Sequence, residues 1–209
     1  MKPAGKPTRD GGEIFIVDNN KPLELLSVWI NEAKDKGIIE PTAMSIATLN
    51  KSGFPTNRMV LAKYLYDEQI GFFTNLESDK SLEIIANQNV SATFWWPEME
   101  RQVRVEGQAE QMPREQVEEY HSTRPRRSRI AAWASDQSRE LESMENLRER
   151  FLHYESKFEN KIVPAPPFWG GFTITINRVE YWSGRPNRLH ERVSLTRNGD
   201  CWSEQRLFP

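Results

Sequence analysis

Apolar side chains recur every three or four positions near the start of the chain. These positions are Leu23, Leu26, Trp29, Ile30 and Ala33. The spacing predicts one amphipathic helix that runs to Gly37 and turns its apolar face towards a core. We expect Asn20 to be the N-cap and Pro22 to lie in the first turn.

Alternation of apolar and polar side chains marks the clearest strand, at residues 102–110. Its inward positions are Val103, Val105, Gly107 and Ala109. Shorter runs rich in β-branched and aromatic residues predict strands at residues 43–49, 58–65, 70–74, 90–96, 171–176, 179–183, 191–196 and 201–207. The first of these runs follow one another closely, which favours antiparallel pairing.

Helical spacing returns in two further segments, residues 78–86 and 139–158. Many strands, few helices and no βαβ alternation predict a mainly β fold: an antiparallel β-barrel with flanking helices. Residues 1–20 are rich in Gly, Pro, Lys and Asp, which predicts a mobile N-terminal arm. Residues 21–209 then form a single domain.

The composition is that of a globular protein. Of the 209 residues, 37% are hydrophobic and 28% are charged, which provides enough apolar bulk for a core. The net charge of −2 gives no overall basic field for a nucleic acid or an anionic membrane. No segment resembles a secretory signal or a membrane span, and Cys201 is the lone cysteine. We therefore expect a cytoplasmic protein without an intrachain disulfide.

Several enzyme classes are excluded by motifs that the sequence lacks. It contains no G-x-G-x-x-G, no Walker-type phosphate loop, no G-x-S-x-G elbow and no H-E-x-x-H. Its three histidines, His121, His153 and His190, are far apart and lack metal-ligand spacing. We therefore expect neither a metal site nor a metal hydrolase.

Two cations bracket an apolar strand in the segment Arg58-Met59-Val60-Leu61-Ala62-Lys63. A phosphate needs such donors, because burying its charge unpaired is costly. Perfect alternation places Arg58 and Lys63 on opposite faces, so joint action at one site needs a bulge or a strand end. A strand with solvated ends explains the same residues.

A second possible phosphate site is the predicted helix start at Ser78-Asp79-Lys80. Free backbone N–H groups at a helix start, with a lysine beside them, can hold a phosphate. An ordinary capped helix start explains the segment equally well.

The strongest basic cluster has four arginines within six positions. They are Arg124, Arg126, Arg127 and Arg129. The segment lacks a nucleic-acid-binding signature, so we expect no nucleic-acid partner, and a folded-back phosphate pocket stays open. Pro125 prevents one continuous helix from aligning Tyr120, Arg124 and Ser128, despite their four-residue spacing.

Another cationic group lies near the C-terminus, at Arg188, His190 and Arg192. If this segment is a strand, all three side chains share one face. Such a face needs either an anion opposite it or partly solvated salt bridges. Both interpretations stay open on the residues alone.

Ordered motifs along the chain resemble those of a known family. They are Arg58-Met59-Val60-Leu61-Ala62-Lys63, Phe72-Phe73-Thr74-Asn75, Glu100-Arg101-Gln102-Val103, Arg124-Pro125-Arg126, Trp133-Ala134-Ser135-Asp136-Gln137-Ser138, Phe168-Trp169-Gly170-Gly171 and Arg188-Leu189-His190-Glu191-Arg192. From about residue 23 to residue 209 the chain resembles the pyridoxine (pyridoxamine) 5′-phosphate oxidase family. The resemblance implies an FMN-binding split β-barrel, a homodimer, and two FMN molecules held in clefts between the subunits.

The resemblance also implies roles for individual residues. The implied FMN contacts are Arg58, Met59, Val60, Leu61, Lys63, Phe73, Thr74, Ser78, Lys80, Gln102, Gln137, Ser138, Trp182 and Arg192. The implied holders of the substrate phosphate are Lys63, Tyr120, Arg124 and Ser128. Arg188 and His190 are the implied catalytic pair, which places the substrate's pyridine ring against the flavin.

The activity implied is oxidation of pyridoxine or pyridoxamine 5′-phosphate to pyridoxal 5′-phosphate, with O₂ reduced to H₂O₂. The sequence departs from the family pattern at several positions. It lacks an N-terminal lid pair, since Arg9 is the only arginine before Arg58 and Tyr64 is the first tyrosine. Asp79 replaces an arginine, and Ala131 replaces a glycine. Two alternatives therefore stay open: oxidation of reduced phenazine carboxylates by the same fold, and a non-catalytic flavin-binding protein.

Overall fold

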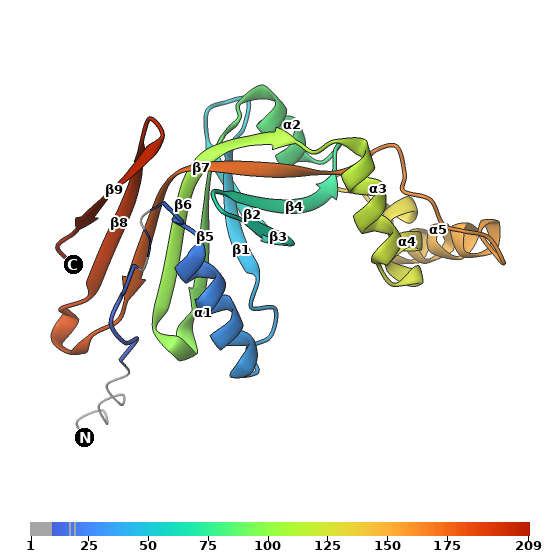
Figure 1. Cartoon of the computed structure of the whole chain (residues 1–209). Coiled ribbons are helices and arrows are strands. Elements are labelled where there is room, and N and C mark those ends of the chain that lie inside the picture. Colours follow the sequence, from blue (N-terminus) through green and yellow to red (C-terminus); the bar gives the residue numbers. More distant parts are fainter. Residues whose placement is uncertain (1–9, 17, 19) are drawn as a thin grey trace, which may run out of the picture.

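The computed structural model describes residues 10–16, 18 and 20–209. In this part of the chain, nine strands form one antiparallel sheet that curls into a half-barrel (Figure 1). The strands are β1 (Ala43–Leu49), β2 (Pro55–Leu61), β3 (Tyr64–Tyr66), β4 (Gln69–Asn75), β5 (Asn89–Trp96), β6 (Arg101–Gln111), β7 (Trp169–Ser183), β8 (Glu191–Asn198) and β9 (Cys201–Arg206). The α-helices are α1 (Glu24–Asp35), α2 (Asp79–Ala86), α3 (Arg114–Thr123), α4 (Arg126–Ala134) and α5 (Met144–Lys157). The predicted mainly β, antiparallel fold with flanking helices is confirmed.

The long strand β7 connects the two parts of the sheet. It pairs with β6 along almost its whole length, with β4 through residues 169–175 and with β8 through residues 178–183. The register shifts between Glu106 and Gly107 of β6, where the sheet divides. The sequence predicted two strands here, at 171–176 and 179–183. They are one strand, because an irregularity bends it without ending its pairing.

Helix α1 packs on the sheet with the apolar face that its spacing predicted. The buried residues of α1 are Leu26, Trp29, Ile30 and Ala33. The ring of Trp29 makes edge contacts with Trp96 and Tyr181, with ring centres 6.4 and 5.4 Å apart. The buried hydroxyl of Tyr181 donates to the carbonyl oxygen of Pro22 at 2.6 Å. This cluster fixes α1 against β5 and β7.

The start of α1 differs from the prediction. Its N-cap is Leu23, whereas Asn20 lies in a turn three residues earlier. The N–H of Asn20 bonds to Oδ1 of Asp18 at 2.9 Å, and the N–H of Lys21 bonds to the Asp18 carbonyl oxygen at 3.0 Å. The predicted N-cap was wrong because Asp18 organises this turn and delays the helix.

The segment predicted as one strand at residues 58–65 is the end of β2 followed by β3. The chain leaves β2 after Leu61, and the N–H of Lys63 bonds to the Gly71 carbonyl oxygen at 2.7 Å. A strand end therefore separates Arg58 from Lys63, which is one of the two conditions under which both could serve one site.

Helices α3, α4 and α5 project from one end of the sheet (Figure 1). The sequence predicted only α5, and predicted its start at residue 139. Instead α5 begins after Ser143, whose hydroxyl accepts the N–H of Asn146 at 3.1 Å. The pattern missed α3 and α4 because they are short, at 10 and 9 residues, so each contains few repeats of the helical period. Their buried residues are Val117 and His121 in α3, and Ile130 and Ala134 in α4. None of the helices in the described residues has the length and apolar character needed to cross a membrane.

Residues 10–16 pack against the sheet instead of projecting as part of the expected mobile arm. Ile14 is 1% exposed and belongs to the core. The N–H of Gly11 bonds to the Gly184 carbonyl oxygen at 2.9 Å. A Cβ at Gly11 would lie 2.3 Å from Oγ of Ser183 and 2.7 Å from the Glu100 carbonyl oxygen, so this approach requires glycine. Residues 1–9, 17 and 19 of the predicted arm lie outside the described residues.

Candidate active site

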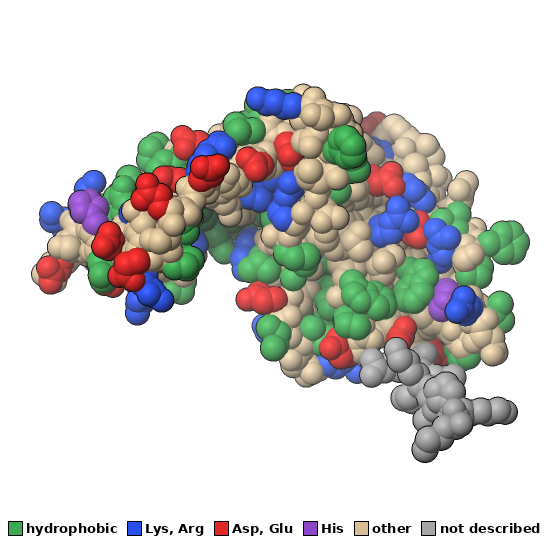
Figure 2. Space-filling view, turned by 180° about the vertical axis from the view of Figure 1, so that it is seen from behind, with side chains coloured by type: hydrophobic (Ala, Val, Ile, Leu, Met, Phe, Trp, Pro, Cys, Tyr) green, Lys and Arg blue, Asp and Glu red, His purple; other side chains and the backbone are tan. Residues whose placement is uncertain are grey.

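A cavity of about 800 Å³ lies where α3 and α4 meet the sheet. Its lining comes from the end of β2, from β4, from α2 to α4 and from the loop that follows α4. Figure 2 shows Lys and Arg side chains gathered around the hollow between the helical projection and the body of the molecule. The predicted site residues that line the cavity are Met59, Val60, Leu61, Lys63, Phe73, Thr74, Lys80, Tyr120, Arg124, Ser128 and Gln137.

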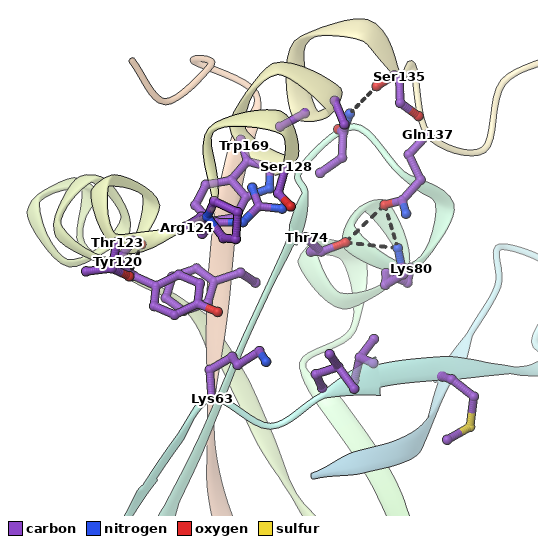
Figure 3. Close-up of a pocket in the computed structure, with 18 of the residues that line it drawn as sticks. Lys63, Thr74, Lys80, Tyr120, Thr123, Arg124, Ser128, Ser135, Gln137 and Trp169 are labelled. Atoms are coloured by element: carbon purple, nitrogen blue, oxygen red, sulfur yellow. Dashed lines mark hydrogen bonds between the residues drawn. The ribbon is translucent and has the colours of Figure 1, made fainter. Parts of the chain in front are cut away.

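Lys80, in the first turn of α2, provides a buried positive charge at one side of the cavity. Its side chain is 6% exposed, and Nζ donates to Thr74 Oγ1 and to Gln137 Oε1, each at 2.9 Å (Figure 3). Nζ also donates to Ser78 Oγ at 3.0 Å. All three acceptors are neutral, and no carboxylate lies within salt-bridge distance of Nζ among the described residues. Burial, with the nearby charge of Arg58, lowers the pKa of Lys80 to about 8. A buried ammonium with neutral partners fits a phosphate, and so this donor set fits the phosphate of FMN.

The loop after α4 brings Gln137 to Lys80. Arg150 of α5 bonds to the Ala134 carbonyl oxygen at 2.8 Å and to Asp136 at 2.7 Å. Arg139 donates to the Glu77 carbonyl oxygen at 2.7 Å. Two arginines therefore tie the loop to α5 and to the start of α2. Sequence spacing could not show this closure, because Gln137 and Lys80 are 57 positions apart.

A second cationic group lies in the wall formed by α3, α4 and β7. The guanidinium of Arg124 stacks on the ring of Trp169, with its carbon 4.7 Å from the ring centre. Tyr120 stacks on Phe73 with ring centres 4.0 Å apart and an interplanar angle of 5°. Figure 3 shows Lys63 reaching into the cavity opposite the group formed by Arg124, Ser128 and Trp169. The cavity therefore has cations at two places, Lys80 and the pair of Arg124 and Lys63.

The break at Pro125 does not separate the three residues of the four-residue repeat. Tyr120 belongs to α3, Arg124 is its C-cap, and Ser128 lies in the first turn of α4. All three line the same cavity. The folded-back pocket that the sequence left open is the observed arrangement of these side chains.

Arg58 is not part of the cavity lining. Its guanidinium pairs with the carboxylate of Glu83 at 3.1 Å, donates to Thr56 Oγ1 at 2.8 Å and also bonds to Thr48 Oγ1. Arg58 is nevertheless near the Lys80 site, since its charge contributes to the lowered pKa of Lys80. Its implied contact with FMN stays a prediction, as does that of Ser138, an exposed residue with φ of 68°.

Three predicted FMN contacts lie in one row across the sheet, together with Trp95, to which the sequence assigned no role. Trp95, Gln102, Trp182 and Arg192 occupy facing positions on β5, β6, β7 and β8. Directly paired residues of antiparallel strands share a face, and the rings of Trp95 and Trp182 are indeed 5.9 Å apart. This Trp95 row is not part of the lining of the cavity.

Arg192 of the row is held by a buried carboxylate. Glu180 is 4% exposed, and its Oε1 accepts from Nε and Nη2 of Arg192 at 3.0 and 2.8 Å. Its Oε2 accepts from Arg178 at 3.2 Å, and Arg104 lies 3.8 Å away. The sequence missed Glu180, although its position two residues before Trp182 places both on one strand face.

Arg188 and His190 do not continue this strand. Pro186–Arg188 is a 3₁₀ turn in which Asn187 and Arg188 have positive φ, and β8 begins only at Glu191. The expected common strand face of Arg188, His190 and Arg192 is therefore wrong, because backbone alternation does not hold in the turn. His190 still contacts the row, with its ring 4.7 Å from that of Trp182.

The two substituted positions, Asp79 and Ala131, both lie close to the cavity or to the start of α2. Asp79 faces Arg139, with 3.7 Å between the carboxylate and the guanidinium, so an arginine from the loop lies near the helix start. Ala131 lines the cavity. Trp169 is a lining residue to which the sequence assigned no role, although a tryptophan followed by two glycines was visible as a motif.

Comparison with known proteins agrees with this geometry. Residues 30–156 match the family described as pyridoxamine 5′-phosphate oxidase. Residues 169–209 match the region described as the pyridoxine 5′-phosphate oxidase C-terminal dimerisation region. The second match covers β7 to β9, with Trp182 in β7, Arg192 in β8 and His190 in the connection between these two strands.

Curated relatives and solved structures resemble the chain over most of its length. A pyridoxine/pyridoxamine 5′-phosphate oxidase of Leptospira biflexa is 44% identical, covering 90% of this chain and 89% of that protein. One of Rubrobacter xylanophilus is 45% identical, covering 90% and 87%. The structure of PhzG from Burkholderia lata in complex with tetrahydrophenazine-1-carboxylic acid is 25% identical, with a TM-score of 0.87 over 94% of this chain and 98% of that one. An FMN-binding, pyridoxamine 5′-phosphate oxidase-related protein from Nostoc punctiforme has the same fold, at 14% identity, a TM-score of 0.72, and coverage of 90% and 98%.

Proposed function

The chain belongs to the pyridoxamine 5′-phosphate oxidase family of FMN-dependent oxidoreductases, and we propose that it oxidises pyridoxine or pyridoxamine 5′-phosphate to pyridoxal 5′-phosphate. O₂ is the electron acceptor in this proposal and is reduced to H₂O₂. Oxidation of the amine also consumes one water and releases ammonia. The fold is the FMN-binding split β-barrel of this family.

One observation supports this substrate class above others: a single cavity contains two separate cationic groups. Lys80 is surrounded by neutral acceptors at one group, and Arg124 with Lys63 forms the other. The cavity can therefore hold two anions at once. FMN supplies one phosphate and a B6 vitamer phosphate supplies the second, so both charged groups of cofactor and substrate find a partner.

The site is completed by a second subunit in this proposal. The Trp95 row and His190 carry predicted flavin and substrate contacts but do not line the cavity of their own chain. They lie in or beside the region that matches the family's dimerisation region. We therefore assign the cavity of one protomer and the row of the other to one FMN site in a homodimer.

The proposed roles follow from the charges and hydrogen bonds. Lys80 with Gln137 holds the FMN phosphate, whereas Arg124 and Lys63 hold the substrate phosphate. Binding both phosphates fixes the orientation of the flavin and pyridine rings before the reaction. Such positioning lowers the activation barrier, because the loss of rotational and translational freedom precedes the chemical step. FMN held by these residues would supply the hydride acceptor for C4′ of the substrate and the route by which the electrons reach O₂, giving H₂O₂.

Arg188 and His190 orient the substrate through its phenolic oxygen in this scheme. The Arg185 N–H bonds to Nδ1 of His190 at 3.2 Å, so a neutral His190 ring carries its proton on Nε2. That Nε2–H can donate to the phenolic oxygen of the substrate. Arg188 is exposed and forms no ion pair with any described residue, which leaves its charge free for the same oxygen.

The test is aerobic turnover by the purified FMN-loaded protein. Pyridoxine 5′-phosphate should cause O₂ uptake, with equal amounts of H₂O₂ and pyridoxal 5′-phosphate formed. Arg188→Ala and His190→Ala should retain FMN, measured by its absorbance, and should turn over more slowly. The assignment of this pair is refuted if both variants keep full activity. A yellow protein with no turnover on either vitamer phosphate would favour a non-catalytic flavin-binding protein.

Reduced phenazine carboxylates are the second candidate substrates. The observation in their favour is the likeness to the Burkholderia lata structure together with the missing Arg and Tyr lid pair. A carboxylate carries less negative charge than a phosphate, so it should bind more weakly to Arg124 and Lys63. Parallel O₂-uptake assays with a reduced phenazine carboxylate and with pyridoxine 5′-phosphate decide between the two.

A further inference from the structure

Unlike Arg58 and Arg192, Arg124 has no carboxylate partner among the described residues, and unlike Arg188 it lines the cavity. Arg58 pairs with Glu83 at 3.1 Å, and Arg192 pairs with Glu180 at 2.8 Å. Arg124 forms no ion pair within the described part of the chain, and its Nη1 is buried without a hydrogen-bond partner. Its positive charge is therefore available to an incoming anion.

The group that holds this guanidinium is an aromatic ring. The guanidinium carbon of Arg124 lies 4.7 Å from the centre of the Trp169 ring, and Figure 3 shows both side chains together in the cavity wall. The face of an indole attracts a cation without neutralising it. A carboxylate in the same place would hold Arg124 equally well but would compete with a phosphate for its charge.

We infer that Trp169 is a positioning residue for substrate binding, which holds the Arg124 guanidinium in the cavity wall with its charge free for the substrate's phosphate. This inference rests on the proposed function, in which Arg124 contacts that phosphate. It assigns to Trp169 an effect on substrate affinity that is transmitted through Arg124.

The ring of Trp169 is itself held firmly by its surroundings. Trp169 is 7% exposed, and its ring is parallel to that of Phe73, with centres 5.3 Å apart and an interplanar angle of 4°. Arg114 donates to the carbonyl oxygens of Trp169 and Pro166, each at 3.0 Å, and to that of Ala165 at 2.8 Å. These contacts fix the position of the Trp169 ring beside Arg124.

His121 supports the same ring without adding charge. It is 1% exposed, and its ring meets that of Trp169 edge to face, with centres 4.9 Å apart. Burial, with the neighbouring charges of Arg124, Arg129 and Arg114, lowers the pKa of His121 to about 4. A neutral imidazole therefore lies beside Trp169 and adds no positive charge next to Arg124.

A double-mutant cycle on the FMN-loaded enzyme tests the inference. Trp169→Leu should raise KM for pyridoxine 5′-phosphate about tenfold, as expected for loss of a desolvated cation–π contact, and should leave kcat within about twofold. It should weaken inhibition by inorganic phosphate by the same factor. In an Arg124→Ala background, Trp169→Leu should have no further effect on KM. Trp169→Phe, which keeps an aromatic face, should recover most of the affinity.

The control is Trp133→Leu. Trp133 is half-buried in the same helical projection, where its Nε1 donates to the Pro164 carbonyl oxygen at 2.9 Å, but it does not line the cavity. KM should stay unchanged in this variant.

Three results would overturn the inference. They are an unchanged KM in Trp169→Leu, an equal loss in the Arg124→Ala background, and a parallel loss of FMN affinity. If Trp169→Leu does not fold, Trp169→Phe should still raise KM about threefold. An unchanged KM in Trp169→Phe would then also overturn the inference. If the wild-type enzyme does not oxidise vitamer phosphates, the proposed function fails by itself. The same cycle is then measured by calorimetry with inorganic phosphate, which still tests Trp169.

Discussion

Replacing Lys80 by methionine should stabilise the protein without FMN and weaken its binding of FMN. The reason is that the ammonium is buried among neutral acceptors. The fall of its pKa from 10.5 to about 8 corresponds to a cost of roughly 3 kcal/mol for keeping the charge in the folded state. Bound phosphate removes this cost, since it supplies the missing negative charge.

The size of both effects can be estimated from the same contacts. Methionine removes the cost of the charge but also three hydrogen bonds to neutral oxygens. Since Thr74 already donates to Gln137 at 3.1 Å, part of that bonding is kept, and we expect a net gain of about 1 kcal/mol. For a chain of this length the Tm of the apoprotein should rise by about 3 °C. Loss of charged hydrogen bonds to the phosphate should raise the Kd for FMN by roughly 10- to 100-fold.

The assay compares thermal unfolding of the apoprotein with FMN binding followed by quenching of flavin fluorescence. Lys51→Met, in the exposed turn between β1 and β2, is the control and should change neither quantity. An apoprotein Tm that falls by several degrees in Lys80→Met would refute the argument that the buried ammonium lacks an anionic partner. A Kd for FMN that stays within twofold of wild type would refute the assignment of Lys80 to the phosphate.

Four further outcomes are expected. The Kd for FMN should rise above pH 8, towards tenfold per pH unit, because the phosphate needs protonated Lys80; pH titrations of wild type and Lys80→Met should differ there. The apoprotein should meanwhile gain stability between about pH 8 and 10.5, since the unfolded chain binds the Lys80 proton more tightly over that window. Glu180→Gln should destabilise the protein by about 2 kcal/mol in urea unfolding and also weaken FMN binding. That figure is below the usual cost of breaking a buried ion pair, because the arginines around Glu180 are partly in water. The Lys80→Met and Arg192→Ala variants should each be poorly active alone. When the two are co-expressed, activity should recover to about a quarter of the wild-type value, because half of the dimers are heterodimers and each heterodimer has one intact site of its two. No recovery in purified heterodimers would argue against a site shared between subunits.

Local pattern was sufficient for most of the sheet and for α1. The alternation in β6 and the helical spacing of α1 each require one apolar face, and that face is buried in both elements. Helices α3 and α4 were not predicted because they are short, at 10 and 9 residues, and so contain few repeats of the helical period. Nor could the pattern show that residues 171–176 and 179–183 belong to one strand, since the continuity of β7 depends on its pairing with β6 across the irregularity.

The candidate site likewise has features that follow from the sequence and features that follow only from the fold. The sequence itself determined the kinds of side chain present: Lys80 at a helix start, Arg124 beside Pro125, and the motif that contains Trp169. Only the tertiary structure decided which of them meet. It brings Gln137 to Lys80 and Trp169 beneath Arg124, and it pairs Arg58 with Glu83. The physical reason is that composition and spacing specify charge and periodicity along the chain, whereas the neutralisation of a charge depends on partners that only folding brings within a few ångströms.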